Sequence, residues 1–190
     1  MSDQVVSALS AFFERWLRYQ SSRLLPLRVA LDPDWVSPCL HGPVVDGQQC
    51  WRPTLRQAPG SMANLESALN TRFHPAVAAF YGHWFSQPLQ ASFKGLSLTL
   101  LQPWNEADYE RLQENLLAHW LMQRRLKLPE SHFLATTRRD DRVISLDNLS
   151  GAVQLEQLGV GCVAVLATDL ATFLNRLEPL VAPVPGEVGD

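Results

Sequence analysis

Apolar residues recur every three or four positions between residues 105 and 128, and this spacing predicts a long amphipathic helix. The apolar stripe consists of Tyr109, Leu112, Leu116, Leu117, Trp120 and Leu121. Asn105 stands at the start with Asp108 three residues later, a pattern typical of a helix N-terminus, and Pro129 follows the end. We therefore expect this helix, with the strand before it, to form the centre of the fold.

Shorter stretches on both sides of this helix alternate between apolar and polar residues, which predicts strands. The expected strands cover residues 44–45, 48–51, 89–93, 96–102, 133–137, 143–147, 152–158 and 163–166. Asp46-Gly47 and Lys94-Gly95 are two-residue turns of the kind that joins antiparallel neighbours. Because strands joined by short turns pair with one another, we expect an antiparallel or mixed sheet in meander order.

Further helices are predicted before and after these strands. They cover residues 2–20, 61–72, a segment that begins at Pro75, and a last helix that Thr168 caps and that ends before Pro179. Residues 21–38, with three prolines, are expected to form a linking loop. Together the elements indicate an α+β fold, a sheet meander flanked by helices, in a single domain of residues 1–181 with a disordered tail at 182–190.

Composition narrows the class of protein. The chain has 190 residues, 46% hydrophobic and 18% charged, which suits one globular domain with a substantial core. Its net charge is −3 and its largest basic cluster is Arg124-Arg125 with Lys127, so nucleic acid is a poor partner. We find neither a secretory leader nor an apolar run long enough to span a bilayer, and expect a soluble protein of the reducing cytoplasm.

Motifs that would indicate catalysis are missing. The chain has no glycine-rich phosphate loop, no serine flanked by glycines as in a nucleophile elbow, and no Cys-x-x-Cys pair. Cys39, His41 and Cys50 are close in sequence but lack a fourth ligand at a recognisable spacing, so we expect no metal and no cofactor. We therefore favour a non-enzymatic protein that works through its surface. An enzyme built around His119 or His74 with a nearby carboxylate remains an open alternative.

Glu106, Glu110 and Glu114 are four residues apart, so they line one flank of the long helix. Such a row is either a solvated acidic edge or one wall of an anionic surface that receives a basic partner. Gln113 projects into the apolar stripe instead, and we expect its amide to be satisfied by hydrogen bonds.

Long segments of the chain resemble the Syd family of SecY-interacting proteins, which belongs to the SUKH superfamily. These segments are LTLLQPWNEADYERLQENLLAHWLMQRRLKLP (Leu98–Pro129), FLATT (Phe133–Thr137), VISLDNLSG (Val143–Gly151) and LATDLATFLNRLEPL (Leu166–Leu180). The resemblance implies a SUKH-like α+β fold and a peripheral protein at the cytoplasmic face of the bacterial inner membrane. It would bind the basic cytosolic loops of SecY, the translocon channel, and monitor or interfere with improperly assembled Sec complexes.

In that family the contact surface is an acidic groove. Carried over to this sequence, its candidate residues are Glu106, Asp108, Glu110, Glu114, Asp147 and Glu156. Before the long helix, Ser86-Gln87-Pro88 and Lys94-Gly95 offer no carboxylate, which predicts a shallower groove and salt-sensitive binding. Because SUKH relatives include immunity proteins, neutralisation of a toxin is the alternative function.

Overall fold

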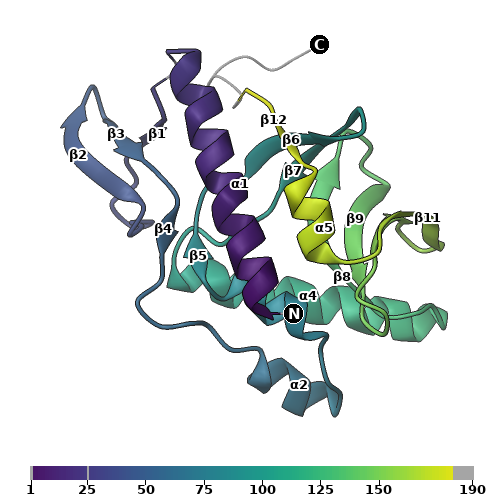
Figure 1. Ribbon diagram of the computed structural model, residues 1–190. Helices are drawn as coiled ribbons and strands as arrows, with labels where there is room; N and C mark the ends of the chain where they lie inside the picture. Colours follow the sequence, from purple (N-terminus) through teal and green to yellow (C-terminus); the bar gives the residue numbers. More distant parts are fainter. Residues whose placement is uncertain (1, 25, 182–190) are drawn as a thin grey trace.

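A computed structural model describes residues 2–24 and 26–181, and the predicted disordered tail lies outside these described residues. The helices are α1 (Ser2–Ser22), α2 (Ala63–Leu69), α3 (Pro75–Tyr81), α4 (Glu106–Leu126) and α5 (Leu170–Asn175). Figure 1 shows their arrangement around a curved sheet, with α4 as the long helix that runs across the lower half of the view, above α2. The prediction of an α+β fold is confirmed.

The main sheet has seven strands in the order β11-β10-β9-β8-β7-β6-β12, and neighbours pair antiparallel. These strands are β6 (Leu89–Phe93), β7 (Leu96–Leu100), β8 (Ser131–Thr137), β9 (Arg142–Asp147), β10 (Val153–Gln157), β11 (Gly161–Ala167) and β12 (Glu178–Pro179). Two smaller sheets contain β1 (Arg28–Ala30), β2 (Leu40–Val45) and β3 (Gln48–Trp51), and β4 (Thr54–Leu55) with β5 (Trp84–Phe85). From β6 to β11 the strand order follows the sequence, as expected of a meander.

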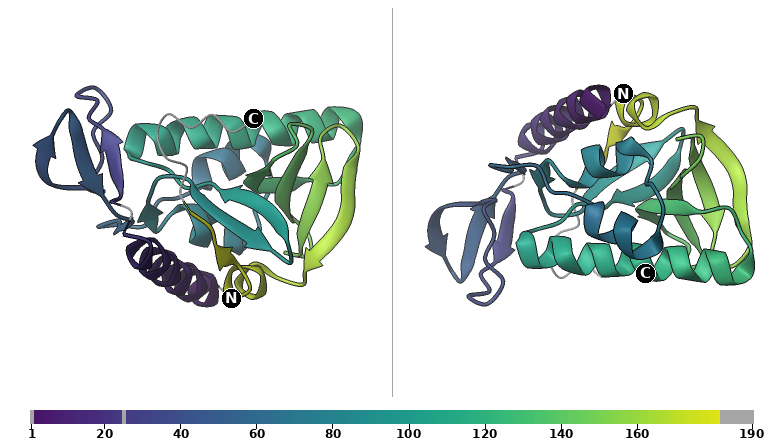
Figure 2. Two further views of the ribbon diagram at one scale, coloured as in Figure 1. Left: turned by 90° about the horizontal axis from the view of Figure 1, so that it is seen from above. Right: turned by 90° about the horizontal axis from the view of Figure 1, so that it is seen from below.

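The main core lies between the sheet and the helices. One row of side chains crosses four strands and is fully buried: Leu89, Leu100, Ala135 and Ile144. On α1, Phe12 and Trp16 are also fully buried, and Trp16 Nε1 donates to the carbonyl oxygen of Gln90 at 3.1 Å. Figure 2 shows α1 and α5 along one side of the molecule and α4 along the opposite side, with the sheet between them.

Several predicted details need correction. The last helix is capped by Asp169, whose carboxylate accepts from the Thr172 amide at 2.8 Å, and not by Thr168. Leu121, assigned to the apolar stripe of α4, is half exposed. The helix predicted over residues 61–72 is shorter, because Asn70 adopts a left-handed conformation that ends α2. The linking loop contains the short strand β1, which pairs with β3.

Candidate functional site

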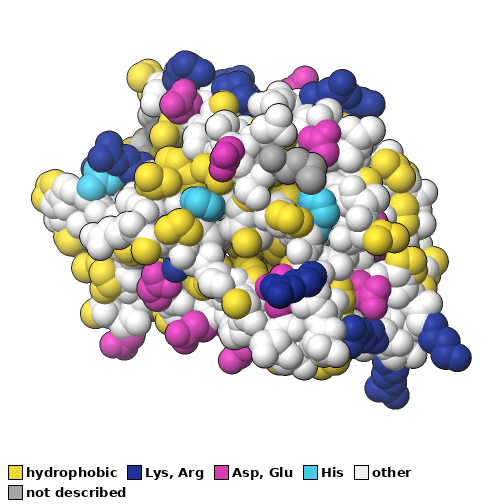
Figure 3. Space-filling view, turned by 60° about the horizontal axis from the view of Figure 1, so that its bottom comes forward, with side chains coloured by type: hydrophobic (Ala, Val, Ile, Leu, Met, Phe, Trp, Pro, Cys, Tyr) yellow, Lys and Arg dark blue, Asp and Glu magenta, His cyan; other side chains and the backbone are white. Residues whose placement is uncertain are grey.

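The acidic row predicted on α4 lies on the exposed surface. Glu106, Glu110 and Glu114 are exposed, and within the described residues neither Glu110 nor Glu114 forms an ion pair or a side-chain hydrogen bond. Figure 3 shows Asp and Glu side chains along the lower left edge, over the N-terminal half of α4. We call Glu106, Glu110 and Glu114 the acidic flank.

Glu106 is held by an arginine from another element. Both of its carboxylate oxygens accept from Nη2 of Arg56, at 2.9 and 2.7 Å. The Arg56 side chain is only 7% exposed and its guanidinium stacks between the rings of Phe85 and Tyr109, 4.5 Å from each centroid. Arg56 therefore fixes the first carboxylate of the acidic flank and neutralises it.

Asp108 forms hydrogen bonds at the N-terminus of α4. Its carboxylate accepts from the backbone amide of Trp104 at 2.8 Å and from Arg111 at 2.6 Å, while the Asn105 side chain accepts from the Asp108 amide at 2.8 Å. Stacking of Arg111 over Trp35, 5.0 Å from the ring centroid, orients this arginine. Four carboxylates on the first half of α4 thus face two guanidinium groups, which leaves a surplus of two negative charges at Glu110 and Glu114.

Asp147 lies apart from this flank, at the end of β9. One of its carboxylate oxygens accepts from the Ser150 amide at 2.7 Å and from the Ser150 hydroxyl at 2.6 Å, so it builds the turn between β9 and β10. The adjacent Asn148 ties this turn to the start of α3, because its Oδ1 accepts from the His74 amide at 2.8 Å. Burial lowers the pKa of His74, and the negative charge of Asp147 offsets part of that effect.

Glu156 is buried, with 1% of its surface exposed, and so is not part of a partner-facing surface. Its carboxylate accepts from Ser131 at 2.5 Å, from Ser145 at 2.6 Å and from Gln123 at 3.0 Å, and His119 Nε2 lies 3.4 Å away. Burial by itself raises the pKa of this carboxyl, but hydrogen bonds from His119, Ser131 and Ser145 outweigh burial and lower the pKa to about 2. The carboxylate is therefore ionised and satisfied inside the protein.

The chemistry available to this buried cluster is limited by its hydrogen bonds. The Ser131 hydroxyl already donates to Glu156, and the Gln123 amide group donates to the same serine oxygen at 2.6 Å. The serine is 1% exposed and the His119 side chain 8% exposed, so both groups are buried. We therefore assign the cluster a structural role, in which it joins α4 to β8, β9 and β10.

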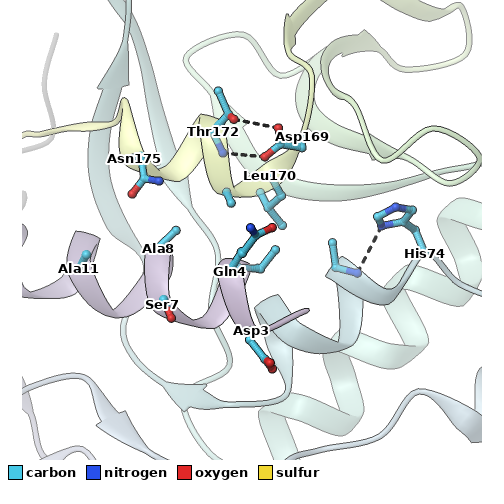
Figure 4. A pocket seen from close by; sticks show the side chains of 13 residues that line it. Asp3, Gln4, Ser7, Ala8, Ala11, His74, Asp169, Leu170, Thr172 and Asn175 are labelled. Atoms are coloured by element: carbon cyan, nitrogen blue, oxygen red, sulfur yellow. Dashed lines mark hydrogen bonds between the residues drawn. The ribbon is translucent and has the colours of Figure 1, made fainter. Parts of the chain in front are cut away.

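Two hollows open on the face that carries α3. One, of about 790 Å³, lies between the N-terminal part of α1, the start of α5 and the first turn of α3. Figure 4 shows Asp3 and Asp169 at this hollow, where Asp169 is bonded to Thr172. The other, of about 570 Å³, is bounded by α2 and α3 and has an apolar lining that includes Met62 and Phe73. His74 lines both hollows.

The structure also bears on the metal and membrane expectations. Among the described residues, no group of three or more His, Cys, Asp and Glu side chains is arranged to hold a metal ion. Cys39 is buried, Cys50 half-buried and Cys162 exposed, and none is in a disulfide. Over the same residues, no helix combines the length and the apolar character that a membrane span requires.

Arg56 is the residue of this region that the sequence did not indicate. It follows the two-residue strand β4, fifty positions before Glu106, and nothing in its local pattern distinguishes it from a solvated arginine. Only the pairing of β4 with β5, which brings Phe85 opposite Thr54, places it beside α4.

Comparison with known proteins gives the family. Residues 6–179 match the family model described as Syd protein (SUKH-2). Proteins named Protein Syd are similar over nearly the full length: that of Tolumonas auensis is 50% identical, covering 95% of this chain and 92% of the relative. That of Aeromonas salmonicida is 49% identical, covering 95% and 99%, and that of Aeromonas hydrophila is 48% identical with the same coverage. The chain belongs to the Syd family.

Proposed function

We propose that this protein binds a Lys- and Arg-rich segment of a partner through the acidic flank of α4, without catalysing a reaction. The partner implied by the family resemblance is SecY. This protein would bind the basic cytosolic loops of SecY at the cytoplasmic face of the bacterial inner membrane. There the protein would monitor or disturb Sec complexes that are improperly assembled.

The single observation that carries the proposal is the unneutralised charge of Glu110 and Glu114. Both carboxylates are exposed on the same flank of α4, next to Glu106, which Arg56 holds in place. Cytoplasmic loops of membrane proteins are enriched in Lys and Arg, so charge complementarity favours this pairing. Because the carboxylates are exposed, their attraction to a partner is screened by salt.

The test is binding to membrane vesicles that contain SecY and expose its cytosolic side. We expect binding at low salt, weakened at high salt, and a roughly 3- to 10-fold loss of affinity for the Glu110→Gln, Glu114→Gln double variant. Exposed acids elsewhere supply the matched control, Glu14→Gln with Asp46→Asn, which removes the same charge and should bind like the wild type.

An affinity for the vesicles that does not change with salt concentration would rule out the acidic flank as the contact. So would an affinity of the Glu110→Gln, Glu114→Gln variant equal to that of the wild type. Absence of binding to SecY-containing vesicles together with co-purification of a nuclease toxin would support the toxin-neutralising alternative instead.

A further inference from the structure

The end of α4 opposite the acidic flank combines exposed apolar side chains from two elements. Leu126, in the last turn of α4, is 46% exposed, and Leu158 and Val160, in the turn between β10 and β11, are 38% and 59% exposed. The two elements are adjacent, because a Cβ on Gly161 would lie 3.6 Å from the Leu128 side chain. Figure 2 shows this turn beside the C-terminal end of α4 in both views.

The segments that meet at this end of α4 contain more basic than acidic residues. Leu158 also donates its amide to the carbonyl oxygen of Asp141 at 2.9 Å, which joins the turn between β8 and β9 to the same region. We call residues 121–130, 138–142 and 158–160 the basic end. Its charged residues are Arg124, Arg125, Lys127, Arg138, Arg139 and Arg142 against Glu130, Asp140 and Asp141, a surplus of three positive charges in a chain whose net charge is −3.

Some cations of the basic end are paired with carboxylates, and in the part of the chain that the structure describes Arg125 and Lys127 are not. Arg124 lies 3.5 Å from Glu130 and Arg139 lies 2.9 Å from Asp141. Within the described residues, Arg125 and Lys127 have no ion pair and both are exposed. In Figure 3, Lys and Arg side chains gather at the lower right, over the end of α4, away from the Asp and Glu side chains at the lower left.

We propose that the basic end docks directly on anionic lipid headgroups. Lys and Arg side chains next to exposed leucine and valine are the combination that binds a bilayer interface, because the charges meet acidic headgroups while the apolar tips enter the acyl boundary. The long cationic side chains extend to the headgroups without burying their charge.

The shape of this region favours a lipid surface over a protein partner. The apolar side chains stand on a helix end and a hairpin turn, and none of them lines either of the two described hollows. Docking on a bilayer needs no pocket, because the exposed apolar side chains themselves enter the acyl boundary. The basic end shares no residue with the acidic flank, so this docking goes beyond the proposed function and does not depend on it.

Co-sedimentation with protein-free vesicles tests the proposal. The full chain is mixed with vesicles of phosphatidylcholine containing 30% phosphatidylglycerol and with vesicles of phosphatidylcholine alone. We expect partitioning to the anionic vesicles that decreases with salt, and none to the neutral vesicles. Each cation near an anionic surface contributes a factor of about 5, so the Arg125→Gln, Lys127→Gln variant should bind roughly 25-fold more weakly.

The apolar part needs its own variant and both variants need controls. Leu126→Ser with Val160→Ser should also reduce binding, because it removes two exposed side chains without opening the core. Arg52→Gln with Arg176→Gln removes two exposed cations elsewhere, and Leu149→Ser removes a leucine that is 94% exposed in another turn. Neither control should change vesicle binding.

Three results would overturn the proposal. They are an absence of binding to the anionic vesicles at low salt, equal binding to neutral vesicles, and a loss of binding that is the same for the Arg52 and Arg176 control as for the Arg125 and Lys127 variant. Because the vesicles contain no protein, none of these results bears on the acidic flank.

Discussion

Gly151 is a position where a single methyl group should be costly. Its φ is +74°, a left-handed conformation that side chains disfavour, and a Cβ there would lie 2.5 Å from Nε2 of His74. The imidazole cannot easily retreat, since its Nδ1 accepts from the Ala76 amide at 3.3 Å. We expect Gly151→Ala to lower the free energy of unfolding by about 3 kcal/mol, measured by urea denaturation.

Gly47 supplies the matched control for that substitution. Its φ of +71° is nearly the same, but a Cβ there would have no neighbour within 4 Å. Gly47→Ala should therefore cost only the backbone strain, about 1 kcal/mol. Equal losses for the two variants would show that the contact with His74 does not contribute.

The buried Glu156 predicts a specific loss of stability in acid. Its folded pKa of about 2 lies below the ordinary value of 4.5, so the unfolded chain takes up the proton more readily than the folded chain. The stabilisation is fully present above pH 4.5 and is lost as the pH falls towards 2, by roughly 3 kcal/mol.

Urea unfolding at pH 6, 4 and 2.5 checks this effect. Glu156→Gln should be less stable than the wild type at pH 6, and the difference should narrow as the pH falls. Glu110→Gln removes an exposed carboxylate, so its free energy of unfolding should vary with pH as that of the wild type does. A difference between wild type and Glu156→Gln that is constant with pH would contradict the ionised, hydrogen-bonded state of Glu156.

At the residue scale, the sequence predicts roles that depend on neighbours in the chain. Asn105 caps α4 as expected, because the capping bond to Asp108 is local. Thr168 and Asp169 both have side chains that can cap a helix, and the pattern could not decide between them. The burial of Glu156 was missed because strand alternation assigns a residue to a face without showing what covers that face.

At the scale of elements, Arg56 connects the β4–β5 pair to α4. Glu106→Gln would leave its buried guanidinium without a carboxylate, so we expect this variant to lose about 1–2 kcal/mol of unfolding free energy. Glu110→Gln, one turn along the same flank, should stay within about 0.5 kcal/mol of the wild type. Thermal unfolding of the two variants compares them directly, and equal stability would mean that Glu106 does not hold Arg56.

The long elements were predictable and the very short ones were not. α4 repeats its apolar stripe over 21 residues, and the β6–β7 hairpin has both alternation and a Lys94-Gly95 turn with positive φ at each residue. β4, β5 and β12 have two residues each, too few to show any period. Their pairing depends on partners distant in sequence, which no local pattern reveals.

At the scale of the whole molecule, α4 separates two opposite charges. From Glu106 to Arg125 the helix rises about 28 Å, with the acidic flank at its start and the basic end at its finish. The sequence shows both charge groups, but not that the turns at 138–142 and 158–160 come to the same end, since that follows from the twist and pairing of the sheet. The small net charge of −3 is therefore the sum of opposite charges that lie at different ends of α4.

This separation predicts that the two proposed contacts act independently. Glu114 and Arg125 are about 16 Å apart along the helix, beyond the distance over which substitutions normally couple. On anionic vesicles that contain SecY, the free-energy losses of the Glu110, Glu114 variant and of the Arg125, Lys127 variant should add in the fourfold variant to within about 0.5 kcal/mol. A coupling above 1 kcal/mol would mean that both groups meet one partner surface, whereas additivity supports a protein held by lipid at one end and by a basic loop at the other.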